Sequence, residues 1–152
     1  MKDWNKIFDS LSDDEKDNLA ILRVIECTNG VIQHMHRNGD DDALSLEETR
    51  TAMKFSMGCM KTQEIPLGDE VITFTPETKE ILCMIRELYI SGFKNNNQED
   101  YNEFMIASKA NLSAIGKERI LRARTILFEH LYDIPYYTLD WGISYIFGLM
   151  QW

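Results

Sequence analysis

The sequence predicts an all-α or nearly all-α protein: a single domain spanning residues 1–152, in which about six helices pack as an irregular bundle with at most one short strand pair. Ser, Thr and Asn residues stand directly before several apolar segments with helical spacing, as helix N-caps do. The three prolines and eight glycines are scattered, so no linker divides the chain. Hydrophobic residues make up 44% of the sequence, enough for one sizeable core.

Two capping boxes begin the first two expected helices. Ser12 with Glu15 three residues later precedes a long apolar segment that ends near Asn38-Gly39. Ser45 with Glu48 begins a second helix that runs to about residue 60. One stripe of the first helix is expected to face the core: Ile21, Ile25, Thr28, Ile32 and Met35.

The middle of the chain contains the only strand signal and a third helix. Residues 71–74 are rich in β-forming side chains, but the run is short. Thr75 followed by Pro76 is typical of an N-cap before a first-turn proline, and Gly92 is expected to end the helix that follows.

The last third of the chain is expected to form three helices. Asn97 caps the first, Gly116 separates it from the second, and Pro135 precedes the third. Seven of the sixteen aromatic residues fall in the last 21 positions. Because aromatic side chains dominate core burial, this segment is predicted to fill the core; an exposed aromatic patch for a partner is the alternative.

The charge balance limits the classes of partner. The net charge is −9, from 25 acidic and 16 basic residues. Nucleic acid is an unlikely partner for such a chain because phosphates require a basic face, whereas a protein with a basic surface is well suited.

The cysteine content and the apolar segments indicate the compartment. The three cysteines (27, 59 and 83) are far apart in helical contexts, so we expect buried thiols and no disulfide framework. The N-terminus lacks an apolar run of signal-peptide length, and no run approaches the roughly 18 apolar residues of a membrane span. We therefore expect a cytoplasmic protein that does not insert into a membrane.

The aspartate triplet Asp40, Asp41 and Asp42 invites a comparison with calcium-binding loops. In the register that places ligands at Asn38, Asp40 and Asp42, alanine occupies the position that requires glycine, and Thr49 occupies that of the bidentate glutamate. The pattern therefore disfavours calcium. It leaves a polar turn before the helix capped by Ser45, or a docking site for a basic partner.

A basic island interrupts the acidic sequence. Between residues 106 and 128 there are five basic residues and one acidic residue. Two interpretations remain open: a site for an anionic ligand, or an exposed helix face that pairs with the domain's own carboxylates. The candidate ligand-binding residues are Lys117, Arg119, Arg122 and Arg124.

Residue types common in active sites are present without a recognisable arrangement. His34 and His36 are two apart, so they would point to nearly opposite sides of a helix. The chain contains no Cys-x-x-Cys pair, no glycine-rich phosphate loop and no Gly-x-Ser-x-Gly motif. We therefore expect no catalytic residue, no metal and no cofactor. An enzyme that pairs a cysteine with His34, His36 or His130 is the remaining catalytic alternative.

These observations favour a non-catalytic protein that binds another macromolecule. In its concrete form, it is an acidic inhibitor of a basic protein such as a nuclease, of the toxin-immunity or phage-encoded antagonist type. The alternative is a regulator that binds a small anionic ligand or nucleic acid through residues 117–124. The expected partner-binding residues are Asp40, Asp41, Asp42, Glu47 and Glu48.

Overall fold

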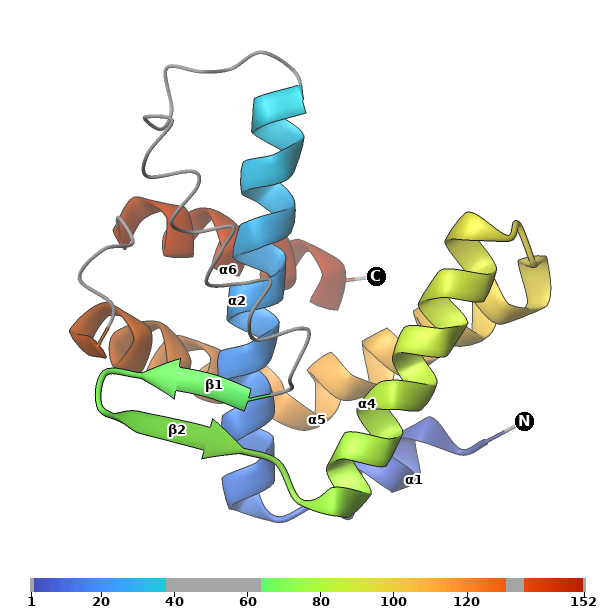
Figure 1. Ribbon diagram of the computed structural model, residues 1–152, viewed down its shortest axis with the longest axis horizontal. Coiled ribbons are helices and arrows are strands. Elements are labelled where there is room, and N and C mark those ends of the chain that lie inside the picture. The colour runs from blue at the N-terminus through green and yellow to red at the C-terminus, as the bar shows by residue number, and fades with distance from the viewer. Residues whose placement is uncertain (1, 38–63, 131–135, 152) are drawn as a thin grey trace.

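The computed structural model describes residues 2–37, 64–130 and 136–151, and these form five α-helices, one π-helical turn and a two-stranded antiparallel sheet (Figure 1). The helix expected near residues 45–60 lies outside the described residues. A short first helix was not expected. In chain order the elements are α1 (Trp4–Asp9), α2 (Asp13–Arg37), β1 (Glu64–Leu67), β2 (Glu70–Thr73), α4 (Pro76–Tyr89), η1 (Ile90–Lys94), α5 (Gln98–His130) and α6 (Tyr136–Met150).

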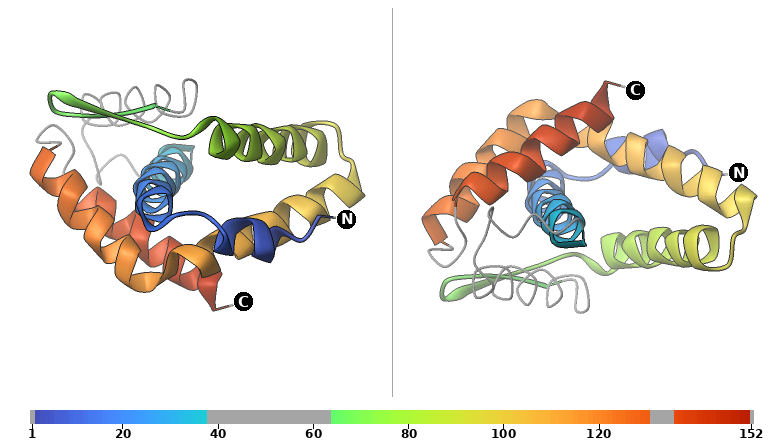
Figure 2. Two further views of the ribbon diagram at one scale, coloured as in Figure 1. Left: turned by 90° about the horizontal axis from the view of Figure 1, so that it is seen from below. Right: turned by 90° about the horizontal axis from the view of Figure 1, so that it is seen from above.

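Helix α2 lies at the centre and packs against both α5 and α6 (Figures 1 and 2). It begins as expected, because the Ser12 hydroxyl accepts a hydrogen bond from the Glu15 backbone N–H at 3.2 Å. The predicted stripe is buried at Ile21, Ile25 and Thr28. Burial is wider than one stripe, however, because neighbours cover α2 on more than one side. Leu19, Ala20, Leu22 and Val24 are also buried.

The short β-rich run is the second strand of the sheet. Residue Ile65 of β1 pairs with Ile72 of β2, and Gly68 in the turn between them has a φ of 61°. The first strand contains Pro66, which weakens any strand prediction from sequence.

Helix α4 begins as predicted and ends differently. Thr75 caps it, with its hydroxyl accepting from the Thr78 backbone N–H at 3.3 Å. Gly92 does not end the helix, because the chain continues through the π-helical turn η1 to Lys94. A Cβ on Gly92 would lie 2.7 Å from Tyr101 Cα, so the glycine allows η1 to pack closely against α5.

The two helices expected on either side of Gly116 form one bent element, α5. Asn97 caps it, accepting at Oδ1 from the Asp100 backbone N–H at 3.2 Å. Gly116 has a φ of 79° and a ψ of 160°, values outside the helical range that favour glycine. The separation predicted at Gly116 is therefore confirmed as a kink.

Helix α6 crosses α2 closely at Gly142, where a Cβ would lie 2.8 Å from the Thr28 backbone nitrogen. The terminal segment is part of the core, but aliphatic residues supply the buried contacts: Leu139, Ile143 and Ile146 are buried, whereas Tyr145 is 53% exposed. None of the described helices combines the length and the apolar character needed to cross a membrane.

Candidate functional site

The residues expected to bind a basic partner, Asp40, Asp41, Asp42, Glu47 and Glu48, lie outside the described residues. Their role and their arrangement therefore stay predictions.

The acidic stretch at residues 9–17 is divided by the structure into two kinds of carboxylate. Asp9 and Asp14 are exposed. Asp13 and Asp17, one helical turn apart on α2, form ion pairs with α5. Glu15 is buried at 8% exposure and turns toward the start of α4. Three of the five carboxylates of the stretch therefore have contacts within the fold, although Asp13 remains 87% exposed.

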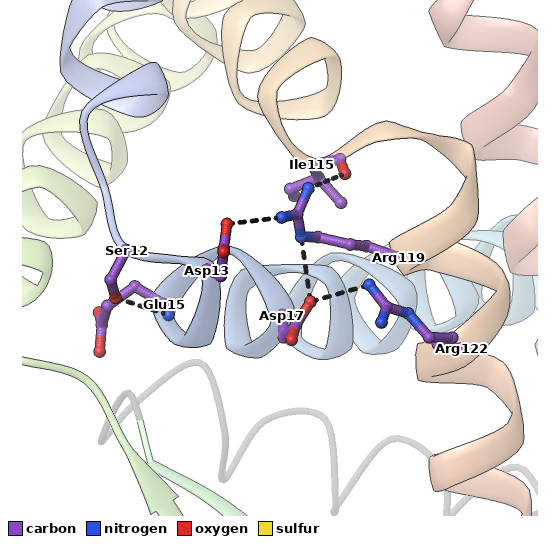
Figure 3. Close-up of polar contacts among 7 residues, drawn as sticks. All are labelled: Ser12, Asp13, Glu15, Asp17, Ile115, Arg119 and Arg122. Carbon is purple, nitrogen blue, oxygen red and sulfur yellow. Dashed lines mark hydrogen bonds and ion pairs between the residues drawn. The ribbon is translucent and has the colours of Figure 1, made fainter.

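Arg119 is the centre of the basic island, and its guanidinium joins two helices (Figure 3). Its Nη2 donates to Asp13 at 2.9 Å and its Nε to Asp17 at 3.0 Å. Its Nη1 donates to the Ile115 carbonyl at 3.2 Å, directly before the kink at Gly116. One side chain thus fixes the bend of α5 against the first turns of α2, which uses the planar, forked geometry of arginine.

The other basic residues of the island also contact the protein itself. Arg122 Nη2 lies 3.4 Å from Asp17, although this side chain is 59% exposed. Arg124 forms two hydrogen bonds with the Asp140 carboxylate on α6, one of them at 3.2 Å between Nη2 and Oδ2.

Lys117 completes the four candidate ligand-binding residues. Its Nζ lies 5.6 Å from the centre of the Phe147 ring, in cation–π geometry. All four candidates therefore have intramolecular contacts, and an anionic ligand would compete with carboxylates or an aromatic ring that the fold already provides.

Glu15 links the starts of α2 and α4. Its Oε1 accepts from the Thr75 backbone N–H at 3.4 Å, while Oε2 is buried without a hydrogen-bond partner. A capping box would direct this carboxylate back to the backbone of Ser12. The predicted hydrogen bond to Ser12 is confirmed. The predicted return contact of Glu15 is not formed, because its side chain bonds to Thr75 of another element.

A second polar cluster lies between α2 and α5, around Arg23. Arg23 donates to Glu26 Oε2 at 3.0 Å and to Ser108 Oγ at 3.0 Å. Burial alone would lower the pKa of Arg23, but negative charge on Cys27 when its thiol is ionised, and the Glu26 carboxylate that accepts its hydrogen bond, raise the pKa above its ordinary value. Arg23 thus remains a cation inside the fold.

Burial was predicted for all three cysteines, but the two that the structure describes differ in exposure. Cys27 is buried, and burial raises the pKa of its thiol despite the nearby Arg23, so the reactive thiolate is disfavoured. Cys83 is exposed, which corrects the expectation of burial. The side of α4 that carries Ile81, Ile85 and Leu88 packs against the core, and Cys83 lies on the opposite, outer side. Cys59 and the side chains of His34 and His36 lie outside the description, and His130 is exposed.

Sequence reasoning overlooked the outer side of α4 and η1. The rings of Tyr89 and Phe93 are in contact there, tilted by 35° with ring centres 4.8 Å apart, and both rings contact Phe104 of α5. Tyr89, Ile90 and Phe93 are 44%, 37% and 46% exposed. The sequence does indicate this exposure: apolar residues of the segment occupy more of the helix circumference than one buried stripe can cover.

Within residues 2–37, 64–130 and 136–151, no group of three or more His, Cys, Asp or Glu side chains is arranged to hold a metal ion. Comparisons of the chain with protein-family models, with curated proteins and with solved structures find no match.

Proposed function

We propose that this chain is a non-catalytic, acidic protein of the cytoplasm that binds another protein, and that it inhibits a basic target such as a nuclease. The immunity protein of a toxin and a phage-encoded antagonist are its concrete forms. Asp40, Asp41, Asp42, Glu47 and Glu48 are the proposed contacts. Their charges would steer association with the basic cleft that a nuclease needs for phosphate.

The engagement of Arg119 and Arg124 by the protein's own carboxylates is the observation that carries the proposal. These ion pairs neutralise positive charges that would otherwise contribute to a basic face. Two of the four cations at residues 117–124, Arg119 and Arg124, are therefore engaged by carboxylates, and together with the net charge of −9 this favours a basic partner over an anionic one.

The partner is sought by capture on the full chain from nuclease-treated lysate, with elution by rising salt. The captured protein is then tested for its association rate with a variant in which Asp40, Asp41 and Asp42 are replaced by Lys. A matched control replaces three exposed glutamates, Glu80, Glu118 and Glu129, by Lys and changes the net charge equally.

The triple aspartate variant is expected to lower the association rate by roughly tenfold or more and to weaken its salt dependence, because nearby charges steer encounter most strongly. The control is expected to lower the rate much less. Equal effects of the two variants would contradict the assigned contact residues, and a captured target with no basic surface would contradict the proposal itself.

The alternative, a regulator that binds an anionic ligand through residues 117–124, is separated by a different pair of variants. Replacing Asp140 by Asn removes the anion that faces Arg124 and would strengthen phosphate or oligonucleotide binding if the island were a ligand site. Replacing Arg122 and Arg124 by Ala would abolish it. Binding that follows this pattern would favour the regulator over the inhibitor.

A further inference from the structure

The outer side of α4 and η1 gathers cations and exposed apolar side chains on one face. On a helix with 3.6 residues per turn, Lys79, Arg86 and Ile90 fall on one stripe. Tyr89, the last residue of α4, and Phe93 and Lys94 of η1 are exposed next to its end. Glu80 and Glu87 of the same helix fall on the neighbouring edge, and Glu77 lies on the far side. We call these six residues the α4–η1 face: Lys79, Arg86, Tyr89, Ile90, Phe93 and Lys94.

This face runs along one arm of a helical hairpin, from Lys79 in the first turn of α4 to Lys94 at the tip. In Figures 1 and 2, α4 and the first part of α5 project from the packed centre, with η1 joining them at the far end. The hairpin tip is held firmly: Ser91 Oγ donates to Asp100 Oδ2 at 2.5 Å, and Gly92 packs against the Tyr101 backbone. Because η1 is a π-helical turn, its extra residue shifts the helical register, a feature frequent at functional sites.

The aromatic rings are supported on one side and open on the other. Phe93 contacts Tyr101 and Phe104 at ring-centre distances of 5.1 and 5.7 Å, yet it remains 46% exposed. Other exposed large apolar residues of the described chain, such as Val71 and Leu121, stand on separate elements. An adjacent group of exposed apolar residues on a rigid support is typical of an interaction site.

The cations of this face differ from those of the basic island. The side chains of Lys79, Arg86 and Lys94 form no ion pair with any carboxylate among the described residues, whereas Arg119 is bonded to Asp13 and Asp17. Positive charge that the fold leaves unpaired, next to exposed rings, is complementary to a ligand that is both acidic and apolar.

We propose that the α4–η1 face binds a short acidic segment of another protein, an amphipathic helix whose apolar side chains pack on Tyr89 and Phe93 while its carboxylates pair with Arg86 and Lys94. This site goes beyond the proposed binding of a basic target, because it takes a ligand of opposite charge at a different surface. The chain would then bind two partners of opposite charge, a basic protein and an acidic segment, at different surfaces.

A protein segment fits this face better than a polyanion does. Nucleic acid and anionic membranes present dense negative charge, and both require many cations to release counterions or to attach. The α4–η1 face supplies three cations, with Glu80 and Glu87 on the adjoining edge, in a chain with a net charge of −9. A few spaced carboxylates with apolar anchors match this number and spacing.

A display library of random peptides of about 16 residues, long enough for roughly four helical turns, tests the proposal against the full native chain. The expected result is enrichment of peptides that are net acidic and contain Leu, Phe or Trp at helical spacing. Their affinity is expected to fall at least about tenfold when Arg86 and Lys94 are both replaced by Glu, and to fall with rising salt.

Matched variants separate this site from general effects. Replacing Lys6 and Lys16 by Glu changes the net charge equally on α1 and α2, and is expected to leave binding nearly unchanged. Phe93→Ser is compared with Leu121→Ser, because the two side chains are 46% and 49% exposed. Phe93→Ser can also loosen the hairpin tip, because Phe93 contacts other rings. Ile90→Ser removes apolar surface of the face without removing a ring contact, so it tests the role of that surface independently.

Several results would overturn the proposal. They are the enrichment of basic or neutral peptides, no enrichment at all, or equal losses in the face variants and their controls. Oligothymidylate and vesicles of phosphatidylserine with phosphatidylcholine are tested in parallel. Binding of either one in place of the acidic peptides, with loss in the Arg86 and Lys94 variant, would assign the face to a polyanion instead.

Discussion

The close crossing of α6 over α2 depends on Gly142, and replacing this glycine by alanine tests that packing directly. A Cβ on Gly142 would lie 2.2 Å from Thr28 Oγ1, 2.8 Å from Thr28 N and 2.9 Å from Thr28 Cα. Two of these atoms belong to the backbone of α2, so no side-chain rotation relieves the clash. The helices must separate, which disturbs buried contacts along the whole interface.

The expected magnitude is a balance of two effects. Alanine favours a helix over glycine by about 1 kcal/mol, and overpacking in a closely packed interior costs about 1–3 kcal/mol. Because the clash involves the backbone, the cost prevails, and Gly142→Ala is expected to lower the free energy of unfolding by about 1–2 kcal/mol. Gly30 of α2 is exposed, and nothing lies within 4 Å of its Cβ position, so Gly30→Ala is expected to be stabilising.

Urea unfolding followed by circular dichroism at 222 nm measures both variants under the same conditions. The urea midpoint is expected to fall for Gly142→Ala and to rise for Gly30→Ala, with unchanged slopes. A thermal scan should show the same order, at roughly 2–4 °C per kcal/mol for a chain of this size. If Gly142→Ala were as stable as Gly30→Ala, the close approach of α6 to Thr28 would be wrong.

Three further predictions concern the ion pairs, the Glu15 contact and the Cys27 thiol. Arg119→Ala is expected to lower the free energy of unfolding in urea by about 1–3 kcal/mol, whereas Arg122→Ala, which removes an exposed pair, should change it by less than about 1 kcal/mol. Glu15→Ala leaves the Thr75 backbone N–H without its acceptor and should cost more than Glu15→Gln, which keeps an oxygen there; urea midpoints compare the two. Burial raises the pKa of Cys27, so the stability that its neutral thiol contributes is present below the ordinary thiol value of 9.0 and declines above it. Urea midpoints measured across alkaline pH should fall less steeply for Cys27→Ala.

Local chemistry accounts for the parts of the fold that the sequence predicts well. Helix starts depend on a side chain a few residues away, and Ser12, Thr75 and Asn97 each accept the expected backbone hydrogen bond. Gly116 likewise breaks α5 through its own backbone angles. The end of α4 was not predictable in this way, because Gly92 is needed for contact with Tyr101, a tertiary neighbour that no local pattern reveals.

At the candidate site, too, local sequence patterns do not reveal contacts between distant residues. The count of charges in residues 117–124 identified a basic helix but could not identify what neutralises it, since Arg119 and Asp13 are 106 positions apart. The exposure of Cys83 was unpredictable for a related reason: an apolar helical context does not tell which side of the helix meets solvent. Pairing and exposure both depend on the packing of distant elements.

The preferred binding site of an acidic ligand depends on which intramolecular contacts each cation must lose when the ligand binds. A ligand that approaches Arg119 competes with Asp13, Asp17 and the Ile115 carbonyl. Because Asp13 is 87% and Asp17 43% exposed, each ion pair contributes less than about 1 kcal/mol. Such a ligand would also release the kink of α5. A ligand that approaches Arg86 or Lys94 displaces no described carboxylate. For equal contacts, the α4–η1 face is therefore favoured by about 1–2 kcal/mol, roughly five- to thirtyfold in affinity. Replacing Arg86 should consequently weaken the binding of an acidic segment more than replacing Arg119 does.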